Sequence, residues 1–192
     1  REIVELVRRE YYYDLSAGIE VSLRRAARPA NRRGVQLLRD TRGTLALHLA
    51  CVVVVNNELH AVRIGGTQVF LVRRARLFLP GEEPGDLADF VQRTTTRRAA
   101  SLGTEPDLLP AVWRQTVESG DTVIVAAGAL VGSLGAEELR SAAVTLHPRS
   151  AAEHVHNRAV ADGVGGGTSA LFIEIATAPS AAARRDGRRP RP

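Results

Sequence analysis

The sequence contains no lysine and no methionine, and its only aromatic residues are four Phe, three Tyr and one Trp in 192 residues. A hydrophobic core must therefore be built mainly from Val, Leu, Ile and Ala. All 26 basic residues are arginines, which we interpret as a bias of genome composition and not as selection for phosphate or carboxylate recognition. The length suits one domain with a substantial core.

Cysteine pairs and long apolar runs are also missing. Cys51 is the only cysteine, so no intramolecular disulfide can form, and its place in an apolar run predicts a buried, unreactive thiol. No apolar run reaches the ~18 residues of a membrane-spanning helix, and no signal-peptide pattern opens the chain. We therefore expect a cytoplasmic protein without a membrane span. Because the first residue is Arg1, we also expect the sequence to be a fragment or a trimmed chain.

Positive charge is concentrated near the C-terminus. The formal net charge is +5, and residues 184–192, with five arginines and one aspartate, supply +4 of it, which leaves about +1 for the rest. A basic face for nucleic acid is therefore not expected. The composition predicts a folded domain over residues 1–175 and an Arg/Pro-rich disordered linker or tail over residues 176–192.

Residues 43–80 are predicted to form the central strands. The run at residues 45–55 is apolar and β-branched almost throughout, which favours a strand that is buried on both faces. Three turns, Asn56-Asn57, Gly65-Gly66 and Arg73-Arg74-Ala75, separate it from strands at residues 59–64, 69–72 and 77–79. The spacing predicts an antiparallel meander of three or four strands that ends at Pro80.

Two amphipathic helices are predicted before these strands. The first covers residues 1–14, with a buried stripe of Ile3, Leu6, Val7 and Tyr11. Ser16 is the predicted N-cap of the second, in which Pro29 is expected to cause a kink or a split. The arginines of this second helix are interpreted as a solvated outer face; they are Arg24, Arg25, Arg28, Arg32 and Arg33.

After residue 80, turns alternate with strands and helices. The predicted order is a loop at 81–85, a short helix at 87–92, a polar crossing at 93–101, a hairpin of strands 112–117 and 122–126, helices at 137–143 and 151–161, and a strand at 168–175. This order predicts an α+β fold in which two antiparallel sheets lie between helices.

Several short motifs occur in the same order as in the metal-dependent serine/threonine phosphatases of the 2C type, the PPM family. Gly43-Thr44 opens the first strand, Leu102-Gly103 forms a Leu-Gly pair, and Gly120-Asp121 makes a Gly-Asp turn before an apolar strand. In these features residues 3–175 resemble that family. The resemblance implies the family's α-β-β-α sandwich, two antiparallel sheets flanked by helices, with the family's N-terminal strands falling before Arg1.

The motifs that carry acids in that family are degenerate here. Gly65-Gly66-Thr67-Gln68 stands where the family has Gly-Asp-Ser-Arg, Ala127-Gly128-Ala129 where it has Ser-Asp-Gly, and Gly165-Gly166 where it has Asp-Asn or Asp-Asp. The family hydrolyses phosphoesters with Mg²⁺ or Mn²⁺ ions, which need several carboxylate ligands. Because Gly66, Gly128 and Gly165 have no side chains, the resemblance implies a pseudophosphatase with no catalytic residue, no metal site and no cofactor.

Other residues do not replace the missing acids. Asp121 belongs to a turn at the far end of a strand, Glu174 lies well along the last strand, and the single carboxylate of Asp162 cannot hold a binuclear site. His154 and His156 are two positions apart on a predicted helix and do not share a face, so we interpret them as surface histidines. No metal-binding constellation is therefore expected.

The glycines at these motif positions allow a different use of the cleft in which the family would hold its metal ions. The backbone N–H groups of Gly66, Gly128, Gly165, Gly166 and Gly167 could form an uncharged nest for an anion. The favoured alternative is that these glycines only fill the space that acidic ligands and metal ions occupy in the family. The segment at residues 163–167 precedes a strand and has no lysine, so it is not a P-loop.

Two functions of different classes follow. The favoured one is a bacterial, catalytically inactive phosphatase-like domain that serves phospho-signalling as a regulatory or protein-binding module. Its partner would be a kinase, a phosphoprotein or, in a homodimer, a second copy. The alternative is an active metal-dependent serine/threonine phosphatase, completed by acids outside this chain or by an atypical site. Nucleic-acid binding through the arginine-rich tail is a distant third.

Overall fold

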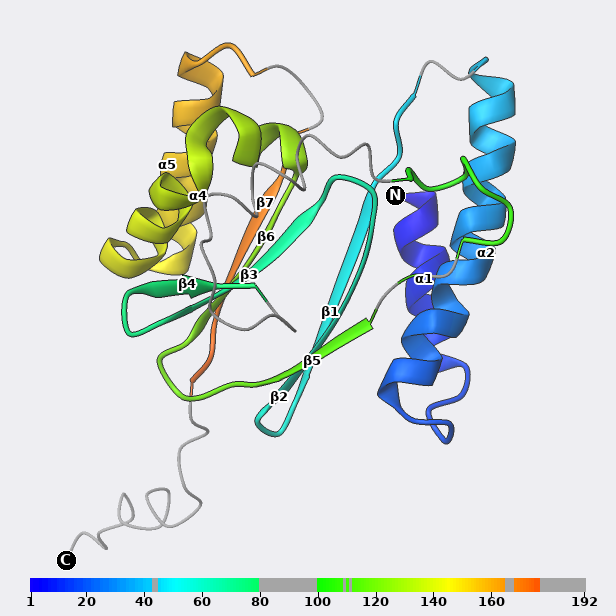
Figure 1. Ribbon diagram of the computed structural model, residues 1–192, viewed down its shortest axis with the longest axis horizontal. Coiled ribbons are helices and arrows are strands. Elements are labelled where there is room, and N and C mark those ends of the chain that lie inside the picture. The colour runs from blue at the N-terminus through cyan, green and yellow to red at the C-terminus, as the bar shows by residue number, and fades with distance from the viewer. Residues whose placement is uncertain (43–44, 80–99, 109, 111, 165–167, 177–192) are drawn as a thin grey trace, which may run out of the picture.

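A computed structural model of the chain describes residues 1–42, 45–79, 100–108, 110, 112–164 and 168–176 (Figure 1). Its helices and strands are, in order, α1 (Glu2–Tyr12), α2 (Ile19–Asp40), β1 (Leu49–Val55), β2 (Glu58–Ile64), β3 (Gln68–Arg73), β4 (Arg76–Phe78), β5 (Val112–Thr116), β6 (Thr122–Ala126), α4 (Gly128–Thr145), α5 (Pro148–Ala161) and β7 (Ala170–Glu174). None of the described helices is both long and apolar enough to cross a bilayer.

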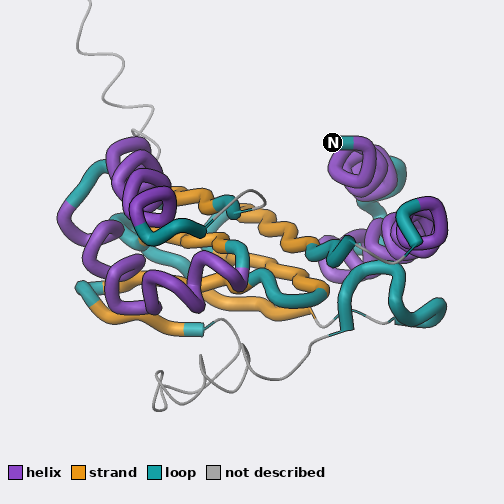
Figure 2. The backbone as a smooth tube through the Cα atoms, turned by 90° about the horizontal axis from the view of Figure 1, so that it is seen from above, coloured by secondary structure: helices purple, strands orange, loops and turns teal. Residues whose placement is uncertain are grey.

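The strands form two antiparallel sheets, one in the order β1-β2-β5 and the other in the order β4-β3-β6-β7. The sheets lie between two pairs of helices, with α1 and α2 beside the first sheet and α4 and α5 beside the second (Figures 1 and 2). The predicted α+β sandwich with outer helices is therefore confirmed.

Alternation along the strands produces three apolar layers. In β2, Leu59 and Ala61 pack between the sheets, whereas Val62 and Ile64 pack against α1 and α2. β3 and β6 repeat this pattern, with Val69, Leu71 and Val123 between the sheets and Phe70, Val72 and Ile124 in the cluster that includes α4 and α5. Because these strands are covered on both faces, apolar residues occur on both faces and strict polar alternation is missing, although β2 also carries His60 and Arg63.

Two connections differ from the prediction. β2 and β3 belong to different sheets, so Gly65-Gly66 carries the chain from one sheet to the other instead of closing a hairpin. The turn at residues 119–121 does the same between β5 and β6. The hairpins at Asn56-Asn57 and at Arg73-Arg74-Ala75 are confirmed, because β1 pairs with β2 and β3 pairs with β4, but the continuous meander and the second hairpin are wrong. The same small and polar residues suit a turn within a sheet and a turn between sheets, so turn chemistry does not distinguish them.

The first strand is shorter and less buried than predicted. β1 begins at Leu49, and Leu49 is its only buried residue. It lies at the edge of its sheet, paired only with β2 among the described strands, so its side chains are partly open to solvent. The predicted burial on both faces is wrong. Cys51 is accordingly only partly buried, and desolvation raises the pKa of its thiol.

Helix ends also differ from the prediction. The backbone N–H of Ser16 donates to Asp14 at 2.9 Å, and α2 begins after Gly18 with φ at +85°, so Ser16 is not the cap. α2 runs through Pro29 as one helix, so the expected split is wrong. α4 begins at Gly128, well before residue 137, and Gly135 interrupts it with φ 81° and ψ 160°.

Several predicted segments lie outside the described residues. They are Gly43-Thr44, Pro80, the loop at 81–85, the helix at 87–92, most of the crossing at 93–101, residues 165–167, and residues 177–192 of the tail. The division into a domain over residues 1–175 and a tail over residues 176–192 stays a prediction.

Candidate functional site

Two of the degenerate motifs meet at one end of the sandwich. Gly66 lies in the turn between β2 and β3, and Gly128 is the first residue of α4, directly after β6. β3 and β6 pair with Gln68 opposite Ala126, which brings the two segments side by side. A Cβ atom on Gly128 would lie 2.2 Å from the carbonyl oxygen of Gly66. The fold therefore places these two glycines in one site.

The two glycines differ in the space available to a side chain. A heavy atom 2.2 Å from a Cβ is a severe overlap, so an aspartate at residue 128 would force the Gly66 backbone to move. A Cβ on Gly66 would come no closer than 3.8 Å to the His48 ring, which is an ordinary contact. Backbone atoms thus occupy one of the places where the family resemblance puts an acidic side chain.

His48 contacts the Gly66 turn, and sequence analysis missed it. Its Nδ1 accepts a hydrogen bond from the backbone N–H of Gly66 at 3.1 Å. Desolvation lowers the pKa of His48, which favours the neutral ring that this acceptor role needs. The bond also uses the Gly66 N–H, so the predicted anion nest is not supported at that residue. Gly165, Gly166 and Gly167 lie outside the described residues, so their part in the nest stays a prediction.

Arg63 is a second basic residue at this turn that sequence analysis missed. It donates to the carbonyl oxygen of Thr67 at 3.5 Å and to the buried side chain of Gln68. Its guanidinium lies 5.3 Å from the centre of the Trp113 ring, within the range of a cation–π contact. A positive charge therefore lies beside the turn at which the family carries an aspartate.

The residues that the structure describes do not fit a pair of divalent metal ions. Mg²⁺ and Mn²⁺ prefer oxygen ligands, chiefly carboxylates. No three His, Cys, Asp or Glu side chains in the described ranges come together in a group that could hold an ion. His154 is exposed, as predicted for a surface residue, and its Nε2 lies 2.8 Å from Oε1 of Glu138 on α4.

The three acids considered as substitutes have other places in the fold. Asp121 precedes β6, and Glu174 pairs in register with Thr122, so both lie at the opposite end of β6 from Gly128. Asp162 follows α5 and lies 4.0 Å from Arg158.

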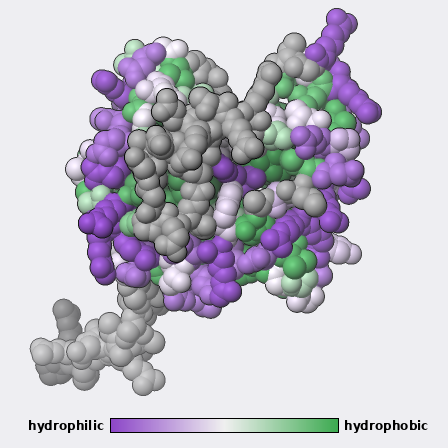
Figure 3. All heavy atoms as spheres, viewed as in Figure 1, coloured by the Kyte–Doolittle hydropathy of each residue, from purple (hydrophilic) through white to green (hydrophobic). Residues whose placement is uncertain are grey.

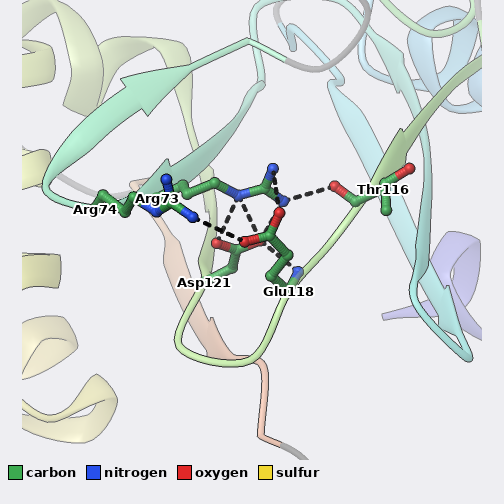
Figure 4. Close-up of polar contacts among 5 residues, drawn as sticks. All are labelled: Arg73, Arg74, Thr116, Glu118 and Asp121. Atoms are coloured by element: carbon green, nitrogen blue, oxygen red, sulfur yellow. Dashed lines mark hydrogen bonds and ion pairs between the residues drawn. The ribbon is translucent and has the colours of Figure 1, made fainter.

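The buried Asp121 forms an ion pair with the partly buried Arg73, which also reaches the other sheet (Figure 4). Its carboxylate accepts hydrogen bonds from Nη2 of Arg73 at 2.7 Å and from the backbone N–H of Glu118 at 2.7 Å. Arg73 also donates to the carbonyl oxygen of Thr116, at the end of β5, at 2.9 Å. Burial on its own raises the pKa of Asp121, but these donors outweigh it and hold the pKa below its ordinary value. The Gly-Asp turn thus has a structural role.

The Leu-Gly pair fixes another segment to a helix. The Leu102 side chain is buried, and its backbone N–H donates to Leu47 at 2.8 Å. Gly103 has φ at +87°, and a Cβ on it would lie 2.3 Å from the carbonyl carbon of Gly34 in α2. Glycine alone combines this backbone conformation with so close an approach.

No protein-family model matches the sequence, and a search of curated proteins gives no match either. Three-dimensional comparison with solved structures does give matches. PppA, a key regulatory component of T6SS in Pseudomonas aeruginosa, aligns with a TM-score of 0.70 and 19% identity, over 88% of this chain and 75% of that chain.

Two structures of the serine/threonine phosphatase PstP are also similar. PstP/Ppp of Mycobacterium tuberculosis aligns with a TM-score of 0.72 and 15% identity, over 92% of this chain and 81% of that chain. The catalytic domain of PstP in complex with two manganese ions aligns with a TM-score of 0.71 and 15% identity, over the same 92% and 81%. The chain therefore has the fold of the PPM serine/threonine phosphatases.

Proposed function

We propose that this chain is a phosphatase-like domain that acts by binding a partner and does not hydrolyse phosphoesters. One observation carries the proposal: the Gly66 carbonyl oxygen lies 2.2 Å from the position of a Cβ on Gly128. Hydrolysis in this fold depends on carboxylates that hold divalent ions. A site whose backbone fills the place of one such carboxylate, and which has glycine at the second, does not supply that ligand set.

The charge beside the turn supports the same proposal. The Arg63 guanidinium contacts Thr67 and Gln68, the two residues after Gly66. A like charge next to a cation site disfavours the bound cation, most strongly where water is partly excluded. No hydrolytic step through a metal ion follows from these residues.

The proposed partner is a phosphorylated protein in a signalling pathway. The structurally similar proteins include serine/threonine phosphatases, and PppA is described as a regulatory component of T6SS. Fold analogy supports a regulatory role in phospho-signalling, and the altered site supports binding over turnover. A kinase or a second copy of the chain is the alternative partner.

The test is phosphate release by the purified chain in excess Mn²⁺, with an aryl phosphate and a phosphothreonine peptide as substrates. We expect no release above that of buffer with Mn²⁺. PstP, measured in parallel, shows that the assay works. Release that scales with protein concentration and stops on chelation would overturn the proposal. It would establish the alternative, an active phosphatase that draws its ligands from elsewhere, including the acids at residues 80–99 that lie outside the described ranges.

A further inference from the structure

A second site is formed between α2 and the segment that follows the Leu-Gly pair. A pocket of about 440 Å³ is lined by Arg28, Asn31, Arg32, Pro106, Asp107 and Leu108. None of these residues belongs to the degenerate motifs. Figure 3 shows hydrophilic surface along the right-hand border of the molecule, where Figure 1 places α2.

The arginines of α2 fall into two groups, which their sequence did not distinguish. Arg24 pairs with Glu20 at 3.8 Å, Arg25 with Asp14 at 3.0 Å and Arg33 with Glu2 at 2.7 Å. Arg28 and Arg32 have no ion pair or side-chain hydrogen bond in the described part of the chain, and both line the pocket. They are four residues apart, so they lie on the same face of the helix. Arg28 and Arg32 thus face a cavity without a partner of their own, whereas Arg39, the third unpaired arginine of α2 in the described chain, lies outside the pocket.

A buried polar residue holds the opposite wall of the pocket in place. The Asn31 side chain is 3% exposed. Its Oδ1 accepts the N–H of Gly103 at 2.7 Å, and its Nδ2 donates to the carbonyl oxygens of Glu105 at 2.6 Å and Pro106 at 3.2 Å. The close contact of Gly103 with Gly34 adds a second attachment. The cavity is therefore bounded by backbone that is anchored to the helix bearing both arginines.

We propose that this pocket binds the phosphate group of a phosphorylated serine or threonine on a protein partner. Two guanidinium groups on one face present several N–H donors in planar forks, which match the oxygens of a phosphate dianion. Asp107 lines the same pocket and opposes the anion, so the site carries a net positive charge from two arginines and one aspartate. The carboxylate can accept an N–H of the partner's backbone. This inference rests on the proposed function for the class of partner and adds the site at which that partner is bound.

The test measures binding of a fluorescent alanine-rich pentapeptide with a central phosphothreonine to the full chain, by anisotropy in EDTA. The variant Arg28→Gln/Arg32→Gln removes both donors. The matched control, Arg39→Gln/Arg76→Gln, removes two charges from arginines that are also exposed and unpaired in the described chain but lie outside the pocket. All substituted side chains are exposed, and thermal unfolding of each variant verifies the fold.

We expect the pocket variant to weaken binding at least about tenfold and the control to change it less than about twofold, because charge-assisted hydrogen bonds are lost only in the first. Asp107→Asn should tighten binding about two- to fivefold, since it removes the opposing charge, a result that a purely structural role would not give. The unphosphorylated peptide should not bind.

Equal affinity in the pocket variant and the control would overturn the pocket assignment and leave the proposed function intact. Failure of the wild-type chain to bind the phosphopeptide at millimolar concentration would also overturn the pocket assignment. Inorganic phosphate that binds as tightly as the peptide would overturn the protein partner and leave a site for the free anion. Hydrolysis of the peptide after addition of Mn²⁺ would overturn the proposed function by a separate readout.

Discussion

Asp121 illustrates how one acidic residue of a phosphatase-like motif serves stability. Asp121 is 2% exposed and its carboxylate is paired with Arg73, whose guanidinium reaches both sheets. Asp121→Asn should lower the free energy of unfolding by about 3 kcal/mol, because it leaves a partly buried arginine without its counter-charge. Asp162→Asn is the control, since its 4.0 Å pair with Arg158 is more exposed and should contribute less than about 1 kcal/mol. Urea unfolding at neutral pH measures both.

The same pair gives the chain a defined response to acid. The folded-state pKa of Asp121 is lowered, so its contribution is fully present above the unfolded-state pKa of about 3.9 and is lost as the pH falls through the folded-state value. The wild-type chain should therefore lose more stability than Asp121→Asn between about pH 6 and about pH 3. Parallel losses in the two proteins would contradict this assignment.

Gly128 is a second residue whose substitution gives a clear prediction. Gly128→Ala should destabilise the fold by about 2–3 kcal/mol, because the new Cβ overlaps the Gly66 carbonyl oxygen. Gly132 lies in the same helix with nothing within 4 Å of a Cβ, so Gly132→Ala should stabilise by about 0.5–1 kcal/mol. Thermal unfolding compares the two. A neutral Gly128→Ala would show that the site has room for a side chain.

At the scale of secondary-structure elements, the attachment of residues 102–108 to α2 is the contact most open to test. Gly103 and Gly120 both have positive φ, +87° and +90°, but only a Cβ on Gly103 meets another backbone, at 2.3 Å. Gly120→Ala should lower the free energy of unfolding by about 1–2 kcal/mol through backbone strain alone. Gly103→Ala should lower it clearly more. The difference, measured by denaturant unfolding, isolates the contact with Gly34. Equal losses would mean that strain, and not the contact, selects glycine at residue 103.

Strands were more predictable than their pairing. The β-branched and apolar residues of β2, β3 and β6 lie on both faces of each strand because both faces are covered, and this composition indicates strands. Gly65-Gly66 gave no indication that the chain changes sheets there, because a reversal within a sheet needs the same backbone freedom. The start of α4 was missed because Gly128, Gly132 and Gly135 hide a helical pattern that tertiary packing imposes.

The site was predictable only in part. The family resemblance directed attention to Gly66 and Gly128, which the fold does bring together. Arg63 shares its strand face with Leu59 and Ala61, so alternation along β2 could have placed it near the sandwich interior. His48 precedes β1 and has no periodic signal, so its bond to Gly66 depends on tertiary structure. The unpaired state of Arg28 and Arg32 likewise depends on where the acids of other elements lie.

At the scale of the whole molecule, the chain has the fold of the PPM phosphatases, and in the described residues no three His, Cys, Asp or Glu side chains gather into a metal site. The three apolar layers keep the sandwich and its helices as in the similar structures. At one end of the sandwich, glycine stands at two positions where the resemblance puts acids, and a backbone carbonyl and Arg63 lie beside them. The shape of a fold does not by itself fix the chemistry of its site, because one fold can support several functions.

Titration of the full chain with Mn²⁺ in a calorimeter tests this account most directly, because it detects a metal site wherever its ligands lie in the chain. The catalytic domain of PstP, which has been crystallised with two manganese ions, is the positive control. The account predicts no saturable heat at metal concentrations that load the control. Saturable binding of two Mn²⁺ ions to this chain would contradict it.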